Sequence, residues 1–183
     1  MEALPAGPRA TEREEAAHRR WADSDASEPP PEGHAERMTL LRDVVLRAVA
    51  HAADAVVIVD VAGIICYWND GAVRIFGYGP EEMLGSTLDV IIPERLRQRH
   101  NEGFRAAMAR GSTRYGAADL LAVPARHADG RTVSIEFSVV LVEADDGSVG
   151  HVAAILRDVT ERRAREQELR RRIETLGANR QAP

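Results

Sequence analysis

The chain has 183 residues, which is room for one domain of about 100 to 120 residues with appended segments. Its formal net charge of -5, with acidic and basic residues interspersed, argues against nucleic-acid binding, which needs a clustered basic surface. No apolar run approaches the roughly 20 residues needed to cross a bilayer, and the N-terminal region lacks the apolar core of a signal sequence. We therefore expect a cytoplasmic protein that does not bind a membrane.

Two segments precede the main body of the sequence. Residues 1–36 contain five of the nine prolines, many charges and few side chains that can build a core, which predicts a disordered tail. Residues 37–52 carry apolar side chains at helical spacing and predict an amphipathic N-terminal helix. Its apolar stripe consists of Leu40, Leu41, Val44, Val45, Ala48 and Val49. Either the outer face of a sheet or a second copy of the chain can cover this stripe.

Residues 53–160 show the pattern of a single α+β domain. Apolar, β-branched runs at 55–60 and 64–69 flank a short turn that contains Gly63 and predict a β-hairpin. Short helical segments follow, separated by glycine and proline. Three further runs, at 117–127, 132–143 and 149–158, are separated by Asp-Gly turns and predict a three-stranded antiparallel meander.

The longest internal helix is predicted between the hairpin and the meander. It starts at Pro93, runs to about Arg110 and stops at Gly111. Proline has a backbone angle that suits the start of a helix, and glycine suits the position just past its end, so both residues support these bounds. The residues Leu96, His100, Phe104 and Met108 follow one another at steps of four. His100 therefore faces the same side of the helix as the apolar residues.

A second flanking helix is predicted at 161–178, and residues 179–183 are predicted to be disordered. Leu169, Ile173 and Leu176 begin a heptad seam that is too short to define a coiled coil by itself. Together with the apolar stripe of the N-terminal helix, this seam predicts a homodimer, because one small domain should not leave both stripes in water.

Residue patterns typical of catalysis are absent from the sequence. It has no Gly-rich phosphate loop, no nucleophile-elbow serine, no His-Glu-x-x-His motif and no zinc-spaced cysteines and histidines, so we expect no catalytic residues and no enzyme. The only cysteine, Cys66, cannot form an intramolecular disulfide, and its place in a strand predicts a buried, unreactive thiol.

Four segments resemble the motifs of PAS domains. Residues 69–78 read Asn-Asp-Gly-Ala-Val-Arg-Ile-Phe-Gly-Tyr, and the segments 82–85, 128–130 and 158–160 match further PAS motifs in the same order. Together they span roughly 105 residues of the chain, which is more specific than any single motif. The resemblance implies a five-stranded antiparallel sheet with helices on one face, flanked by N- and C-terminal helices.

The segment that ends at His100 is similar to the helix of FixL-type and Dos-type oxygen sensors, in which a histidine is the axial ligand of haem b. This similarity implies His100 as the metal ligand and Arg114 as the partner of a haem propionate. Counting forward from His100, the gas-reading Arg of FixL-type sensors falls at Leu120 and the Met of Dos-type sensors at Ala118. Leu120 and Leu121 would then form an apolar distal face, suited to CO or NO. In PAS domains without haem, such a histidine is a half-buried residue bonded to a carbonyl.

The sequence also disfavours a flavin as the cofactor. Light-sensing LOV modules resemble this fold and carry a reactive cysteine in a helical segment, whereas residues 81–90 contain no cysteine. We therefore expect a sensory PAS module that binds a small ligand, with haem b as the cofactor considered first. It would signal through its flanking helices to a separate effector such as a histidine kinase or a transcriptional regulator. The alternatives are a ligand-free PAS module for association, or the sensor part of a split histidine kinase.

Overall fold

A computed structural model describes residues 34–113 and 120–180 of the chain. Residues 1–33 of the tail predicted at 1–36, residues 181–183 of the segment predicted at 179–183, Arg114 and Ala118 lie outside the described residues. The elements are α2 (His34–Ala50), β1 (Ala55–Asp60), β2 (Ile65–Trp68), α3 (Asp70–Phe76), α4 (Pro80–Met83), η1 (Leu88–Val90), α5 (Glu94–Arg110), β3 (Leu121–Arg126), β4 (Thr132–Glu143), β5 (Val149–Asp158) and α6 (Thr160–Arg180).

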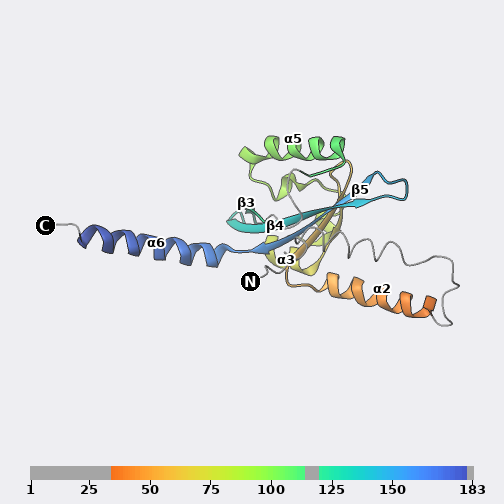
Figure 1. The fold of residues 1–183 in the computed structure, drawn as a ribbon, viewed down its shortest axis with the longest axis horizontal. Coiled ribbons are helices and arrows are strands. Elements are labelled where there is room, and N and C mark those ends of the chain that lie inside the picture. The colour runs from red at the N-terminus through yellow and green to blue at the C-terminus, as the bar shows by residue number, and fades with distance from the viewer. Residues whose placement is uncertain (1–33, 114–119, 181–183) are drawn as a thin grey trace, which may run out of the picture. The chain divides into compact units, whose positions relative to one another are not determined.

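The chain divides into two compact units, residues 1–43 and 44–183. The described part of the first unit is the start of α2, where the Thr39 hydroxyl donates a hydrogen bond to the carbonyl of Ala35 (2.9 Å). The second unit contains the whole sheet and the helices between its strands (Figure 1).

The five strands form one antiparallel sheet in the order β2-β1-β5-β4-β3. The hairpin β1–β2 and the meander β3–β4–β5 join where β1 pairs with β5, from Ala55 opposite Leu156 to Asp60 opposite His151. The α3, α4, η1 and α5 helices connect the hairpin to the meander. The predicted α+β fold with a five-stranded antiparallel sheet is therefore confirmed.

Alternate side chains of the strands build the core. In β1 the burial alternates strictly, as in half-covered antiparallel strands, while β4 buries Val133 and Ile135 and β5 buries Val152 and Leu156. The helices α3 and α4 add Ala72, Phe76 and Met83, all fully buried. The core lies on the helix side of the sheet, and the Trp68 ring packs on Phe76 with 5.4 Å between centroids.

Several element boundaries differ from the sequence prediction. The α2 helix spans His34–Ala50, so it begins three residues before the predicted helix, and residues 34–36 are helical and not tail. Within the described residues β3 begins at Leu121, four residues later than predicted. The C-terminal α6 helix spans Thr160–Arg180 and passes the predicted end at 178.

The α6 helix starts directly where β5 ends, and its first residues are bonded to β4. The Val159 amide donates to the Ser134 carbonyl (2.9 Å), and the Ser134 amide donates to Thr160 Oγ1 (2.9 Å). Asp158 Oδ1 accepts a hydrogen bond from the Thr160 amide (2.8 Å), which gives the first amide of the helix a partner. The first turn of α6 is thus held by the sheet and cannot turn independently of it.

Candidate ligand-binding site

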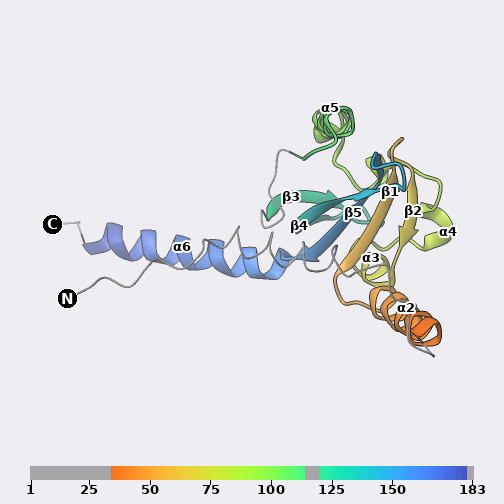
Figure 2. The ribbon, with the colours of Figure 1, turned by 45° about the vertical axis from the view of Figure 1, so that its right-hand side comes forward.

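The α5 helix turns toward the core a face that carries both polar and apolar side chains. It begins after Pro93 and ends at Gly111, which has the left-handed φ of 64° that glycine adopts readily. Phe104 and Met108 pack against the core, and His100 is half-buried on the same face. No residue of α5 is fully buried. Figures 1 and 2 place α5 and α3 toward opposite ends of the sheet.

A cleft of about 280 Å³ lies between α5, η1 and the turn that joins β1 to β2. It is slightly smaller than the roughly 300–1,000 Å³ typical of small-molecule sites. Its described lining residues are Ala62, Gly63, Thr87, Leu88, Asp89, His100, Asn101, Phe104 and Arg105. The lining combines an imidazole, a carboxylate, an amide and a guanidinium with an aromatic ring, so it can accept a ligand with both polar and apolar parts.

The His100 ring is held on two sides within this cleft. Its Nδ1 lies 3.1 Å from Asn101 Oδ1, and Asn101 Nδ2 in turn donates to Asp89 Oδ1 (3.2 Å). Its face stacks on Phe104, with 6.4 Å between ring centroids and 24° between planes. Sequence reasoning singled out His100 but missed Asn101 and Asp89, because their pairing depends on how η1 folds back onto α5.

The other predicted cofactor residues are not gathered at His100. Leu121 is half-buried and pairs with Phe137 across β3 and β4. Leu120 is 68% exposed and precedes β3. Neither leucine is among the described residues that line the cleft. Arg114 lies outside the described residues. Of the predicted site, the structure places only His100 in the cleft.

Cys66 is exposed, so the prediction of a buried thiol was wrong. Ile58 pairs with Tyr67 and Val59 with Ile65, so Cys66 is the extra residue of a β-bulge and its thiol turns away from the core. The thiol donates to the Ile58 carbonyl (3.3 Å), and partial desolvation together with the Asp60 carboxylate raises its pKa. A thiol with a raised pKa on an outer strand is a poor nucleophile.

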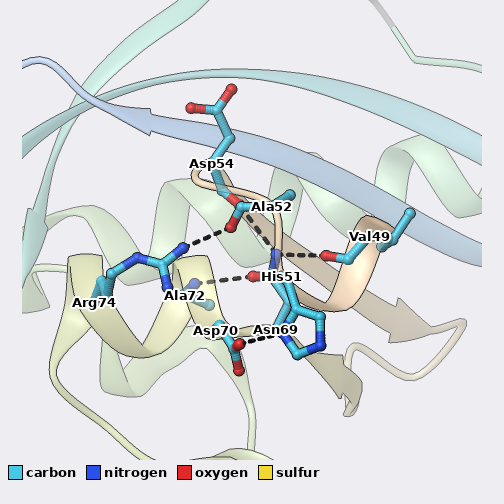
Figure 3. A network of polar contacts seen from close by, with 8 residues as sticks. All are labelled: Val49, His51, Ala52, Asp54, Asn69, Asp70, Ala72 and Arg74. Atoms are coloured by element: carbon cyan, nitrogen blue, oxygen red, sulfur yellow. Dashed lines mark hydrogen bonds and ion pairs between the residues drawn. The ribbon is translucent and has the colours of Figure 1, made fainter. Parts of the chain in front are cut away.

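A second polar cluster joins the end of α2 to the start of α3 (Figure 3). The buried Asn69 side chain, 3% exposed, caps α3 by accepting a hydrogen bond from the Ala72 amide (2.9 Å). Its Oδ1 also accepts from the Val56 amide (2.8 Å), and its Nδ2 donates to the carbonyls of Val49 (2.9 Å) and Asp54 (3.0 Å). All four hydrogen-bonding positions of the amide are therefore used.

Charged side chains reinforce this cluster from outside. The His51 ring lies 2.7 Å from the Asp70 carboxylate, and Arg74 donates to the Ala52 carbonyl (2.7 Å) (Figure 3). Arg157 of β5 forms a two-bond pair with Asp54 (2.9 and 2.6 Å). The short segment between α2 and β1 is thus tied to both α3 and β5. An asparagine between a strand and a helix signals a cap in the sequence, but its long-range partners carry no such signal.

Residues 34–113 and 120–180 contain no group of three or more His, Cys, Asp or Glu side chains placed to hold a metal ion. In the same residues, no helix combines the length and the apolar character required to span a membrane. A single histidine can ligate a metal within a larger cofactor without such a group.

Three curated proteins are similar to parts of this chain. "Sensor protein FixL" of Bradyrhizobium diazoefficiens is 28% identical over 132 residues, which are 70% of this chain and 26% of that protein. "Oxygen sensor protein DosP" of Escherichia coli is 29% identical over 60% of this chain and 13% of that protein. An uncharacterized protein of Azorhizobium caulinodans is 34% identical over 60% of this chain and 15% of that protein. The chain thus matches at most 26% of the length of these relatives.

Solved structures and a family profile agree on the fold. An RNA-binding Light-Oxygen-Voltage receptor aligns with a TM-score of 0.63 and 27% identity, over 81% of this chain and 41% of the receptor. The PAS domain of a Colwellia psychrerythraea protein aligns with a TM-score of 0.58 and 21% identity, over 66% of this chain and 98% of that chain, which supports the fold alone. The family profile described as "PAS fold" matches residues 49–164. The chain therefore belongs to the PAS family of sensory domains.

Proposed function

We propose that this PAS domain is a sensor that holds haem b against His100, with Nε2 of the imidazole as the axial ligand. The observation that carries the proposal is the position of His100: half-buried, on the inner face of α5, with Nδ1 already engaged by Asn101. A neutral imidazole nitrogen is a common protein ligand of haem iron. When bound, the haem would supply an iron atom that takes a diatomic gas as its further ligand.

The inner face of the sheet suits this group in chemistry, but the cleft at His100 leaves little room for it. Apolar side chains of the inner sheet face, including Phe137, Val139 and Leu141, are only half-buried and would be covered by a flat apolar ligand. The cleft of about 280 Å³ is small for a macrocycle, so α5 would have to move outward. Because no residue of α5 is fully buried, this movement would disrupt little close packing.

A light-sensing flavin is the competing cofactor, since one structural neighbour is a Light-Oxygen-Voltage receptor. The covalent chemistry of such modules requires a cysteine beside the flavin. The single cysteine of this chain, Cys66, is exposed on β2, and its thiol is bonded to the backbone of β1. The position of this thiol therefore favours haem over a flavin that forms an adduct.

Reconstitution of the purified chain with hemin tests the haem proposal. We expect a strong Soret band in the wild type, and we expect His100→Ala to abolish it while the far-ultraviolet circular dichroism stays unchanged. His151→Ala, which removes an exposed histidine of β5, is the matched control and should keep the band. A wild-type protein that stays colourless with excess hemin would refute the proposal. An unchanged band in His100→Ala would move the axial ligand to another residue, with half-buried His127 next.

Association through the flanking helices is the second candidate function. Apolar side chains on α2 and α6 are about half exposed or more, which is unusual for so many in one small domain. They are Leu40, Leu41, Val44, Val45, Leu169 and Ile173. In this proposal these side chains form a homodimer interface, or they bind a separate cytoplasmic effector such as a histidine kinase or regulator. We propose no catalytic activity for the chain itself.

Sedimentation would show how much each flanking helix contributes to dimerisation. The three chains to compare are the full chain, a chain that ends at Glu161 and a chain that starts at Ala53. We expect the full chain to be a dimer and each truncation to weaken it, because either apolar stripe alone is short. A full chain that is monomeric at tens of micromolar, roughly where weak interfaces become populated, would leave the helices as surfaces for another protein.

A further inference from the structure

We infer that Asn101 and Asp89 are positioning residues for His100, and that they fix its ring so that Nε2 carries the free lone pair. The inference rests on the proposed role of His100 as an axial ligand. Two hydrogen bonds carry it: the contact between Asn101 Oδ1 and His100 Nδ1 (3.1 Å), and the bond from Asn101 Nδ2 to Asp89 Oδ1 (3.2 Å).

The orientation of the Asn101 amide follows from the chemistry of Asp89. An ionised carboxylate can only accept hydrogen bonds, so the amide must turn its NH₂ group toward Asp89. The opposite orientation would place two acceptor oxygens against each other. The amide oxygen is then directed at His100, and because it can only accept, His100 Nδ1 must carry the ring proton.

This assignment leaves Nε2 of the neutral imidazole as the acceptor atom of the ring. Histidines that bind metals commonly donate their other N–H to a carbonyl or carboxylate, which sets the tautomer and the ring rotation. The oxygen of Asn101 provides that contact here, and Asp89 on η1 anchors Asn101 in turn. Asp89 therefore acts on His100 through Asn101, and both would be positioning residues that hold the ring from behind.

One face of the His100 ring stacks on Phe104, which lies one turn further along α5. Phe104 itself packs over Gly63 in the β1–β2 turn, where an added Cβ would lie 3.6 Å from its Cε1 atom. The His100 ring is thus fixed at one edge by a polar chain and on one face by an aromatic ring.

Nitrogen-15 NMR of the histidine rings in the full-length, cofactor-free chain tests the inference without haem. At about pH 8.5, above the range in which an ordinary imidazole titrates, we expect His100 to be mainly the Nδ1–H tautomer. Asn101→Ala and Asp89→Ala should each shift the population toward the Nε2–H tautomer, whereas Asp89→Asn, which keeps an acceptor oxygen, should largely restore it.

Gln98→Ala is the matched control. Gln98 also donates from its side-chain amide to a carboxylate on α5, that of Glu102, but this pair does not involve His100. The His100 tautomer should therefore be unchanged in this variant. A wild-type ring that is mainly the Nε2–H tautomer, or a tautomer that is unchanged in both Asn101→Ala and Asp89→Ala, would overturn the inference.

Haem titration of the same variants separates this inference from the proposed function. If the wild type binds haem, Asn101→Ala should weaken binding about 10- to 100-fold, the usual effect of losing such a partner, and Gln98→Ala should not. Haem affinity unchanged in Asn101→Ala would contradict the positioning role even if the tautomer shifts. A wild type that binds no haem refutes the proposed function, while the tautomer measurement still decides whether Asn101 and Asp89 orient the ring.

Discussion

The Asn69 cluster and the His100 cleft belong to the same domain but are built in opposite ways. Asn69 is almost fully buried, and its amide makes four hydrogen bonds to three separate elements and a linker. His100 is half-buried on a helix without a fully buried residue, and one ring nitrogen has a single polar contact. A buried polar group with every bond satisfied specifies one arrangement, whereas a half-buried helix can shift at little cost.

This difference separates a fixed end of the domain from an adaptable one. The Asn69 cluster joins α2, β1 and α3, and the pair of Asp54 and Arg157 extends it to β5, which leads into α6. This junction therefore ties the base of α2 to the strand that leads into α6. The predictions below test this contrast, from the largest effect to the smallest.

Removal of the Asn69 side chain should have the largest effect. In Asn69→Ala, two backbone amides lose an acceptor and two carbonyls lose a donor, and water can reach few of them. We expect the free energy of unfolding to fall by about 3 kcal/mol or more, measured by urea denaturation. His100→Ala should reduce it by less than about 1 kcal/mol. Equal losses in the two variants would break the contrast between the two regions.

The same glycine-to-alanine change should have opposite effects in α3 and α5. A Cβ on Gly71 would lie 2.1 Å from the Asp54 carbonyl oxygen, so Gly71→Ala must displace the junction and should destabilise the domain by about 1–3 kcal/mol. A Cβ on Gly103 meets no heavy atom within 4 Å, so Gly103→Ala should stabilise α5 by roughly 0.5–1 kcal/mol. Thermal or urea unfolding would measure both, and a stabilised Gly71→Ala would show that the junction is not tightly packed.

The pair of Asp54 and Arg157 should contribute a smaller, pH-dependent amount. The hydrogen bonds from Arg157 lower the pKa of Asp54 despite the opposing effect of its partial desolvation. A carboxyl whose pKa is lower in the folded state stabilises the fold above its unfolded pKa, which is ordinarily 3.8, and loses this contribution as the pH falls through its folded value. Water screens the pair, because the Arg157 side chain is largely exposed.

Urea unfolding of Asp54→Asn at several pH values measures this contribution. At pH 7 the variant should be less stable than the wild type, and the difference should shrink once the pH falls below 3.8. Asp145→Asn, a change at an exposed carboxylate in the β4–β5 turn, should show a smaller difference at pH 7. A loss in Asp54→Asn that is the same at acidic and neutral pH would mean that the charge of Asp54 contributes nothing.

Local patterns explain why much of the fold could be predicted from the sequence. Alternation in 55–60 and 132–143, and the punctuation of α5 by Pro93 and Gly111, are visible without knowledge of the partners. The exposure of Cys66 was not predictable, because the bulge that turns it outward depends on the pairing of β2 with β1. The five-stranded antiparallel sheet was implied by the PAS motifs together, whereas the order of its strands is seen only in the structure.

The candidate site was predicted only in part, for the same reason. The helical step from Phe104 back to His100 is a property of the local sequence, so the face that His100 occupies could be predicted. Asp89 and Asn101 are 12 residues apart and meet only because η1 folds back onto α5. Leu120, placed by counting along the chain, is exposed, because counting cannot locate the start of β3.

The absence of fully buried residues from α5 also bears on how the domain can evolve. Substitutions along this helix lose little folding free energy, so selection acts on them mainly through what they bind. Substitutions at Asn69 or Gly71 are removed first for their effect on folding. If the domain binds a ligand as proposed, that ligand can therefore change over generations while the junction at the base of α2 stays the same.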